Sequence, residues 1–271
     1  MKTVLICHEN DRIDREVIGP WLASFSDLVG VVIIREPVGR LRSRIKRELK
    51  RSGFLRFLDV LAFRLFYKLV LSKRDKLWQG REIGRLSRIY PTLHEVPQIV
   101  TSSPNSVESE EFLTRFSPDI VVARCKTILK RSVFDRANVA TIVFHPGICP
   151  EYRNAHGCFW ALAKADYEKV GMTLLQIDEG VDTGPVFGYF SYDYDPLNES
   201  HSVIQTRVVT ENLVAIEWKM EEIFSGTAEP IDVSSRESNA FGQPWLTEYI
   251  KIRNRARSLR RAKTKKIAAG Q

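Results

Sequence analysis

Short apolar runs separated by helical patterns are the strongest constraint on how this 271-residue chain can fold. Runs of six or seven residues bounded by turn-forming residues are typical of strands buried inside a sheet. Most of the intervals leave room for a crossover helix, which parallel strands require. We therefore predict an α/β fold with a mostly parallel sheet and strands at Lys2–Cys7, Leu28–Ile34, Pro97–Ser102, Asp119–Arg124, Ala140–His145, Met172–Ile177 and Val186–Tyr192.

Helical patterns fill the intervals between these runs. Ser106 precedes a segment with acidic residues in its first turn, so we expect it to cap a helix over Ser106–Phe116. Further helices are expected over Asp14–Ser24 and around Cys158–Ala165. The pattern after the last strand predicts one long helix over Ser202–Phe224.

The net charge of +8 is concentrated in two segments. Residues 35–88 contain 17 Lys and Arg and 5 Asp and Glu, a net of +12, and residues 251–266 contain 9 Lys and Arg and no acidic residue, a net of +9. The remainder of the chain is acidic. Basic additions of this kind favour polyanions such as nucleic acid, phosphorylated lipid or a phosphorylated substrate. A solvated basic face with a frayed tail is the alternative.

The segment from about residue 36 to 96 has no place in a minimal doubly wound core. Its centre, Phe54–Leu71, is apolar but interrupted by charges, and it is too short to span a bilayer. Three interpretations are open: an amphipathic helix that covers the body or forms a dimer seam, an interfacial helix on anionic lipid, or a lid over a substrate.

The four cysteines contain no CxxC pair and lie on or near apolar runs, which favours reduced structural thiols. No His, Cys or Asp cluster has the spacing of metal ligands, so we predict no metal site. The first residues form a strand pattern rather than a secretory signal. We therefore expect a cytoplasmic protein, with peripheral binding at the inner membrane face as the further option.

Two of the strand ends carry candidate catalytic groups. His145 ends one apolar run, and Asp182 lies in the DEGVDTG loop after another, 37 residues later. Catalytic groups in open α/β sheets gather where strands end in loops. A His and an Asp at neighbouring strand ends can act as a proton-transfer group and its carboxylate partner. We predict that the two side chains lie within about 4–8 Å of each other in one crevice.

The residues around these two groups resemble a known family. The segment VFHPGICPEYRN, a helix, and then VGMTLLQIDEGVDTGP is similar to the core of the formyltetrahydrofolate-dependent formyltransferases, which act on glycinamide ribonucleotide, methionyl-tRNA or sugars. The similarity extends over about residues 117–194. It implies a Rossmann-like core with a mixed sheet edge and 10-formyltetrahydrofolate as the formyl donor. The positions that match the family pattern are His145, Pro150, Tyr152, Arg153, Gly171, Thr173, Asp178, Asp182, Thr183 and Gly184.

The resemblance also implies where the donor would bind. In the family, two loops hold the pteridine ring through their backbones, and these correspond to Arg124–Leu129 and Asp178–Asp182. Asp178 and Gly180 are further expected to shape the second loop, with Gly180 supplying an unusual backbone angle. The predicted donor-binding residues are Arg124, Ile128, Leu129, Asp178, Gly180 and Val181.

One position departs from the family pattern. The catalytic Asn of the family, whose amide donates to the developing oxyanion, is Val143 here. Loss of one such donor costs on the order of 100- to 1000-fold in rate. Asn154 and His156, which follow Arg153, are candidates for a relocated donor. Alternatively, Asn154 caps the helix that begins nearby.

These observations predict an N-formyltransferase that acts on a small amine such as an amino sugar or a sugar nucleotide. The glycine-rich phosphate loop of the glycinamide ribonucleotide enzymes is missing after the first strand, and about 77 residues after Tyr194 leave little room for a tRNA-binding barrel. An inactive relative that binds folate is the first alternative. A basic protein of membranes or nucleic acids is the second. We expect a formyltransferase-like domain over residues 1–195 and a C-terminal helix and basic tail over 196–271. A homodimer is compatible with each of these three functions.

Overall fold

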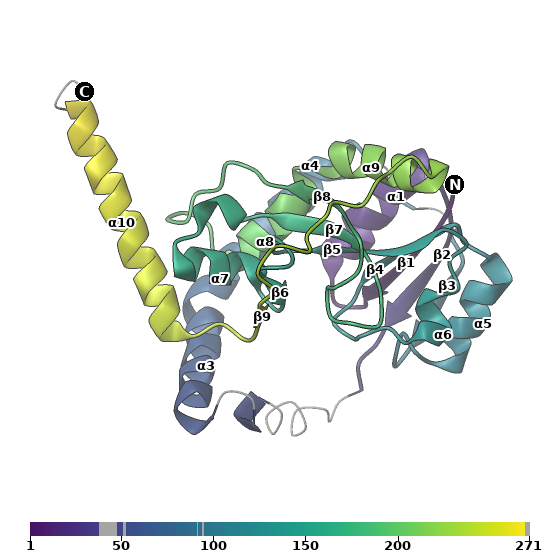
Figure 1. The fold of residues 1–271 in the computed structure, drawn as a ribbon, viewed down its shortest axis with the longest axis horizontal. Helices are drawn as coiled ribbons and strands as arrows, with labels where there is room; N and C mark the ends of the chain where they lie inside the picture. Colours follow the sequence, from purple (N-terminus) through teal and green to yellow (C-terminus); the bar gives the residue numbers. More distant parts are fainter. Residues whose placement is uncertain (38–47, 51–52, 91, 94, 269–271) are drawn as a thin grey trace.

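A seven-stranded sheet forms the centre of the molecule in a computed structural model (Figure 1). The structure describes residues 1–37, 48–50, 53–90, 92–93 and 95–268, without the side chains of 263–268. The strand order is β3-β2-β1-β4-β5-β7-β8. The strands are β1 (Lys2–His8), β2 (Asp27–Ile34), β3 (Gln98–Thr101), β4 (Ile120–Arg124), β5 (Ala140–His145), β7 (Met172–Gln176) and β8 (Val186–Phe190).

The strands from β3 to β5 are parallel, and the remaining edge is antiparallel. Each neighbouring pair among β3, β2, β1, β4 and β5 runs in the same direction. Strand β7 runs antiparallel to β5, and β8 antiparallel to β7. The predicted α/β fold with a mostly parallel sheet and a mixed edge is therefore confirmed, and the seven predicted strands are all present.

Helices cover both faces of the sheet because its central strands alternate apolar residues to either side. In β1, Leu5 and Cys7 belong to one buried cluster, and Val4 and Ile6 belong to another. The first cluster is closed by η1 (Asp14–Ile18), α1 (Gly19–Phe25), α4 (Ser72–Leu86), α8 (His201–Thr210) and α9 (Leu213–Ser225). The second is closed by α5 (Val107–Phe116) and α6 (Arg131–Phe134).

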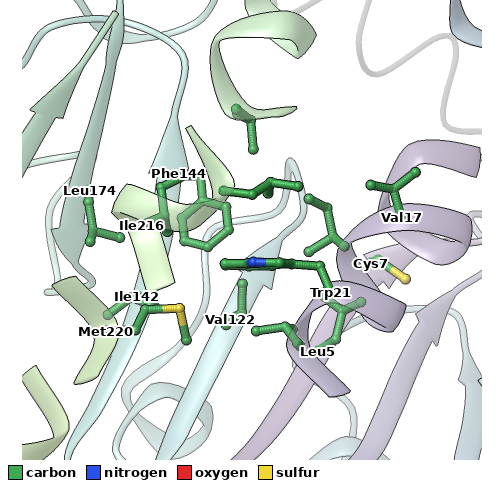
Figure 2. Packing of buried hydrophobic residues seen from close by; sticks show 14 of the residues in the cluster. Leu5, Cys7, Val17, Trp21, Val122, Ile142, Phe144, Leu174, Ile216 and Met220 are labelled. Carbon is green, nitrogen blue, oxygen red and sulfur yellow. The ribbon is translucent and has the colours of Figure 1, made fainter. Parts of the chain in front are cut away.

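The centre of the first cluster is an aromatic pair. Trp21 of α1 and Phe144 of β5 are 0% and 1% exposed, and their ring centroids lie 6.0 Å apart in an edge-on arrangement. Side chains from the sheet and from α9 close around the two rings, as Figure 2 shows for Leu5, Val122, Ile142, Leu174, Ile216 and Met220.

Two of the helix predictions have clear outcomes. The Ser106 side chain accepts a hydrogen bond from the Ser109 backbone N–H at 3.3 Å, which confirms its role as the N-cap of α5. The single long helix over 202–224 is wrong, because the chain forms α8 and α9 with a break at residues 211–212. Asn212 causes this break: its side-chain amide donates to the carbonyls of Val208 and Ser191, at 2.7 and 3.0 Å.

The basic insertion is helical from Phe54 to Leu86. Helix α3 (Phe54–Phe66) continues through a π-helical turn, η2 (Tyr67–Leu71), into α4. Phe63 of α3 is buried against Phe159 and Tyr249, with ring centroids 5.7 and 5.6 Å away. One face of this helix therefore covers the body of the molecule. Residues 38–47, 51–52, 91 and 94 of the insertion lie outside the described residues.

The C-terminal segment forms α10 (Leu246–Ala268), one helix of 23 residues that extends away from the body at one end of the molecule (Figure 1). The predicted C-terminal helix and basic tail are therefore one continuous helix as far as Ala268. Tyr249, Ile252 and Ala256 bury the start of the helix, and the Arg, Lys, Leu and Ala residues that follow are strong helix formers. None of the described helices is long and apolar enough to cross a bilayer.

Three short elements complete the chain: α7 (Gly157–Lys164), the 3₁₀ turn η3 (Tyr167–Lys169), and a two-stranded sheet of β6 (Arg153–Asn154) with β9 (Ala240–Phe241). Helix α7 lies close to its predicted position. The domain boundary at residue 195 stays a prediction; the side chains of α8 and α9 share one buried cluster with the sheet.

We expect Phe144→Ala to lower the free energy of unfolding by about 3–5 kcal/mol, because it leaves a cavity beside Trp21 that close-packed neighbours fill only in part. Phe54→Ala is the matched control, since that ring is 66% exposed, and it should change stability by less than about 0.5 kcal/mol. Guanidinium unfolding curves measure both values. Equal losses in the two variants would contradict the packing described for Figure 2.

Candidate functional site

The candidate site lies at the carboxyl ends of the parallel strands. The strand order reverses at β1, which lies between β2 and β4, and ligands of open α/β sheets bind at such a reversal. His8 ends β1, Arg124 ends β4 and His145 ends β5. The His8 ring accepts a hydrogen bond from the Lys126 backbone N–H at 3.2 Å, which ties the loop after β4 to the end of β1.

His145 and Asp182 are in direct contact. The Nδ1 atom of His145 lies 3.3 Å from Oδ2 of Asp182, and the two side chains are 5% and 16% exposed. The two side chains therefore lie slightly closer than the predicted 4–8 Å; that their strand ends open on one crevice stays a prediction. Asp182 adopts a left-handed backbone conformation, with φ of 52°, that turns its carboxylate toward the ring.

The two ring nitrogens of His145 face different acceptors. Its Nε2 atom lies 2.9 Å from the carbonyl oxygen of Tyr152, which can only accept a hydrogen bond, so Nε2 is the donor of this contact. Its Nδ1 atom faces the Asp182 carboxylate. The two contacts fix the orientation of the ring. None of the described residues donates to the second carboxylate oxygen, Oδ1 of Asp182.

Two glycines let the loop after His145 fold tightly against α7. A Cβ atom on Gly147 would lie 2.5 Å from the Tyr152 carbonyl oxygen and 2.9 Å from Nε2 of His145. A Cβ atom on Gly157 would lie 2.4 Å from the Gly147 Cα. Thr173 of β7 fastens the same loop, because its hydroxyl donates to the Gly147 carbonyl at 2.6 Å and accepts from the backbone N–H of Cys149 at 2.9 Å.

The loop that carries Asp182 is held by Asp178. Oδ1 of Asp178 accepts hydrogen bonds from the Gly180 backbone N–H at 2.9 Å and from the Thr183 hydroxyl at 2.8 Å. This confirms that Asp178 shapes the turn. Gly180 does not supply an unusual backbone angle, so that prediction is wrong. Glycine is needed there for space instead, because a Cβ atom would lie 1.9 Å from the Thr183 hydroxyl oxygen.

The two residues after Tyr152 connect the His145 loop to the Asp182 loop. Arg153 donates to the carbonyl of Val181 at 2.8 Å, and the Asn154 backbone N–H donates to Oδ2 of Asp182 at 2.7 Å. The Asn154 side chain donates to the Phe241 carbonyl at 2.5 Å. The prediction that Asn154 caps α7 is wrong, because α7 begins at Gly157 with His156 at the cap position.

Val143 lies on the same face of β5 as His145, two residues away, in apolar surroundings. It packs against a cluster of Cys149, Leu175 and Val186. The Val143 side chain itself has no hydrogen-bond donor at the position where the family pattern has an amide. The role of Asn154 or His156 as a relocated donor stays a prediction.

His156 and His201 form a buried pair beside α7. Their ring centroids lie 5.7 Å apart, and Phe63 and Phe159 pack around His201. Burial lowers the pKa of His156 to about 4, although hydrogen bonds from its ring to Gln205 and Gln243 oppose the shift. Burial also lowers the pKa of His201 to about 3. Both rings are therefore neutral at pH 7.

The predicted donor-binding residues differ in where their side chains lie. Ile128 is 61% exposed in the loop after β4, whereas Leu129 is buried in the core. A pair between Arg131 and Glu179 at 3.4 Å joins this loop region to the loop that carries Gly180 and Val181. The two loop regions therefore adjoin. The role of these residues in donor binding stays a prediction.

Arg124 forms a buried ion pair that the sequence analysis missed. Its Nε atom lies 2.8 Å from Oδ1 of Asp14, and its Nη1 donates to the Phe144 carbonyl at 3.1 Å. Burial raises the pKa of Asp14 to about 6 in spite of the guanidinium. Asp14 and Arg124 are 110 positions apart, so no local signal could have paired them.

Two further groups near the site were not predicted. Tyr189 of β8 donates to the Cys149 carbonyl at 2.7 Å, and Arg236 forms an ion pair with Glu151 at 2.6 Å. Both fasten the segment between His145 and Arg153 from the outside. Among the residues that the structure describes, no group of His, Cys, Asp and Glu could hold a metal ion.

The comparisons with known proteins agree with this geometry. Residues 67–216 match the family model described as formyl transferase. A methionyl-tRNA formyltransferase from Agathobacter rectalis is 31% identical over 129 residues, which cover 47% of this chain and 41% of that protein. The matched segments cover between 27% and 41% of the length of three such methionyl-tRNA formyltransferases.

Two solved structures share the fold. A sugar N-formyltransferase from Shewanella has a TM-score of 0.51 at 15% identity, over 89% of this chain and 77% of that one. A phosphoribosylglycinamide formyltransferase from Anaplasma phagocytophilum has a TM-score of 0.52 at 12% identity, over 90% of this chain and 99% of that one. At these identities the likeness shows the fold alone, a Rossmann-like core.

The buried histidines predict a pH dependence of stability. Because folding lowers their pKa values, the stabilisation that they contribute is fully present above about pH 6.5 and is lost as pH falls toward 4. His201→Phe fills the same aromatic surroundings without a titrating group. It should remove roughly 1.4 kcal/mol per pH unit from the slope of the unfolding free energy below pH 6. Urea unfolding at several pH values measures the slope, and parallel curves for the two proteins would contradict the burial of His201.

Proposed function

Because the chain belongs to the formyl transferase family, we propose that its cleft transfers a formyl group from 10-formyltetrahydrofolate to the amine of a small molecule. The observation that carries this proposal is the direct contact of 3.3 Å between His145 and Asp182 at the strand ends of the family core. When bound, the folate supplies an activated formyl carbon and a nitrogen leaving group.

Each residue of the pair has a distinct part in the proposed reaction. Attack of the amine nitrogen on the formyl carbon leaves a proton on nitrogen and a negative charge on the formyl oxygen. Oδ1 of Asp182, which has no donor among the described residues, accepts the amine proton, directly or through water. Asp182 then returns this proton to the leaving nitrogen, and the His145 ring, whose two nitrogens face the Tyr152 carbonyl and Asp182, holds the carboxylate in position for both transfers.

The backbone of the two loops is the proposed donor-binding surface. Ile128 and Val181 border it, and Asp178 fixes the shape of the second loop. Arg124 contributes by holding the end of β4 in place through Asp14 rather than by touching the ring. Leu129 anchors the first loop in the core.

The proposed acceptor is an amino sugar or a sugar nucleotide. The segment after β1 continues as HENDRID into η1, without a glycine-rich phosphate loop, which disfavours the amine of a nucleoside monophosphate. An inactive relative that binds folate is the second candidate, and the apolar surroundings of Val143 favour it.

Asp182→Asn tests the catalytic pair. The substitution keeps the shape of the side chain but removes the proton acceptor and the charge that pairs with His145, so the rate of formyl transfer to an amino-sugar panel should fall about 100-fold or more. Asp135→Asn, directly after α6, is the matched control, because that carboxylate is 54% exposed, and it should leave the rate unchanged. A fully active Asp182→Asn enzyme would remove the pair from the mechanism.

Binding is measured separately from turnover. A non-hydrolysable formyl-folate analogue should stabilise the protein by about 2.7 kcal/mol at 100 times its dissociation constant. The control variant Asp135→Asn should keep this shift in thermal unfolding. Stabilisation without turnover would favour the binding protein, and no stabilisation at millimolar analogue would exclude both candidates.

Val143→Asn distinguishes a relocated oxyanion donor from a lost one. If the donor has moved to Asn154 or His156, alanine at that position should raise the barrier by about 2.7–4 kcal/mol, and Val143→Asn should add little. If the donor is lost, Val143→Asn should increase formyl transfer or formyl-folate hydrolysis. Steady-state rates of the single variants and of the Asn154→Ala, His156→Ala double variant decide between the two.

A further inference from the structure

The outer face of α3 and η2 exposes an unusual number of large apolar side chains. Within 17 residues, seven such side chains are 39–80% exposed: Phe54, Leu55, Leu58, Leu61, Leu65, Leu69 and Val70. We call these seven residues the leucine face. Phe54, Leu58, Leu61 and Leu65 recur every three or four residues, so they form one stripe along the helix.

The leucine face is not the face by which the helix packs on the molecule. Phe57, Val60 and Phe63 are the buried side chains of α3, and Phe63 contacts α7 and α10. Helix α3 is therefore apolar on two sides. Apolar side chains grouped on a surface in this way mark an interaction site, because scattered exposure on a monomer does not form a continuous stripe.

Basic side chains border the leucine face. Arg64 and Lys68 alternate with its residues along the chain, and Lys73, Arg74 and Lys76 follow in the next turns. All five side chains are exposed. The acidic residues of the same helices are occupied elsewhere: Asp59 accepts from the Thr247 backbone N–H at 3.1 Å, and Asp75 is buried and accepts from Ser200 at 2.5 Å. The surface around the stripe is therefore strongly cationic.

Helix α10 adds an arginine-lined groove beside this surface. The groove, of about 320 Å³, lies between η2, α4 and α10, with Phe66, Val70 and Leu71 on its apolar side and Arg74, Arg253 and Arg257 on its charged side. Phe66 and Tyr249 join the two helices, with ring centroids 5.3 Å apart. The groove therefore places exposed guanidinium groups next to an apolar wall.

We propose that this surface binds an anionic phospholipid bilayer, with the leucine face at the boundary between headgroups and acyl chains and Arg74 and Arg257 of the groove on lipid phosphates. A helix with leucines and aromatics on one side and Lys and Arg at its edges lies in the plane of the membrane interface. Each basic residue near an anionic leaflet adds to the affinity.

The positive charge around the leucine face favours an anionic bilayer over two other partners. A second copy of the chain would cover the leucines but would bring two cationic surfaces together, which repel. A nucleic acid would pair with the basic residues but would leave the leucine face in water, since its affinity comes from phosphate contacts. An anionic bilayer satisfies both the charge and the apolar stripe.

Co-sedimentation with vesicles tests the proposal. The full chain should bind vesicles of equal parts phosphatidylglycerol and phosphatidylcholine, bind pure phosphatidylcholine weakly, and lose affinity as salt rises. Leu58→Glu with Leu65→Glu should weaken binding at least about tenfold. Val214→Glu with Trp218→Glu is the matched control on α9, because its two side chains are 54% and 64% exposed and the charge change is the same; it should bind like the wild type.

A second variant keeps the test decisive if the leucine variant misfolds. Arg74→Gln with Arg257→Gln leaves the apolar packing intact and should weaken binding to the anionic vesicles by about tenfold, without an effect on pure phosphatidylcholine. Unchanged vesicle binding in both double variants would overturn the proposal. So would tight RNA binding that survives Leu58→Glu with Leu65→Glu, or a leucine variant that changes only the oligomeric state.

Discussion

The close approach of Gly147 to Gly157 is the constraint on which the candidate site depends. It brings the loop after β5 against the start of α7 with no side chain between the two backbones. As a result, the Tyr152 carbonyl reaches Nε2 of His145 and fixes a proton on that nitrogen. The other nitrogen is then left for Asp182. The orientation of the His145 ring toward Asp182 thus follows from backbone packing, and a larger residue at either glycine would change it.

The site is also held from outside by the C-terminal part of the chain. Strand β9 pairs with β6, and the Phe241 ring stacks on Tyr152 with centroids 5.4 Å apart. The Phe241 carbonyl holds the Asn154 side chain, and the Asn154 backbone N–H holds Asp182. The residues after the sheet are therefore part of the support of the site, although none of those that the structure describes contributes a hydrogen bond or ion pair to the His145 ring.

The features that the sequence predicts well are local ones. The strands follow from apolar runs, and the Ser106 cap from a residue type at a helix start. Features that join distant positions could not be predicted, such as the Asp14–Arg124 pair and the β6–β9 pairing. The Gly180 error has a different cause: the residue type indicates that a side chain is excluded, but not whether the backbone angle or a neighbour excludes it. For α10, the high positive charge suggested a tail, although Arg, Lys, Leu and Ala are all strong helix formers.

The left-handed backbone at Asn154, His156 and Asp182 has a consequence for the whole molecule. A left-handed backbone costs most residues other than glycine roughly 1–2 kcal/mol, and Asn, Asp and His adopt it more readily than other residues. Domains of this size are stable by only about 5–15 kcal/mol, so even a reduced cost at three positions is set against a small margin. Glycine at these positions would relieve the cost but remove the groups that define the site. The chain is therefore held below the stability that its core alone could reach, and any ligand that requires this geometry also stabilises the fold.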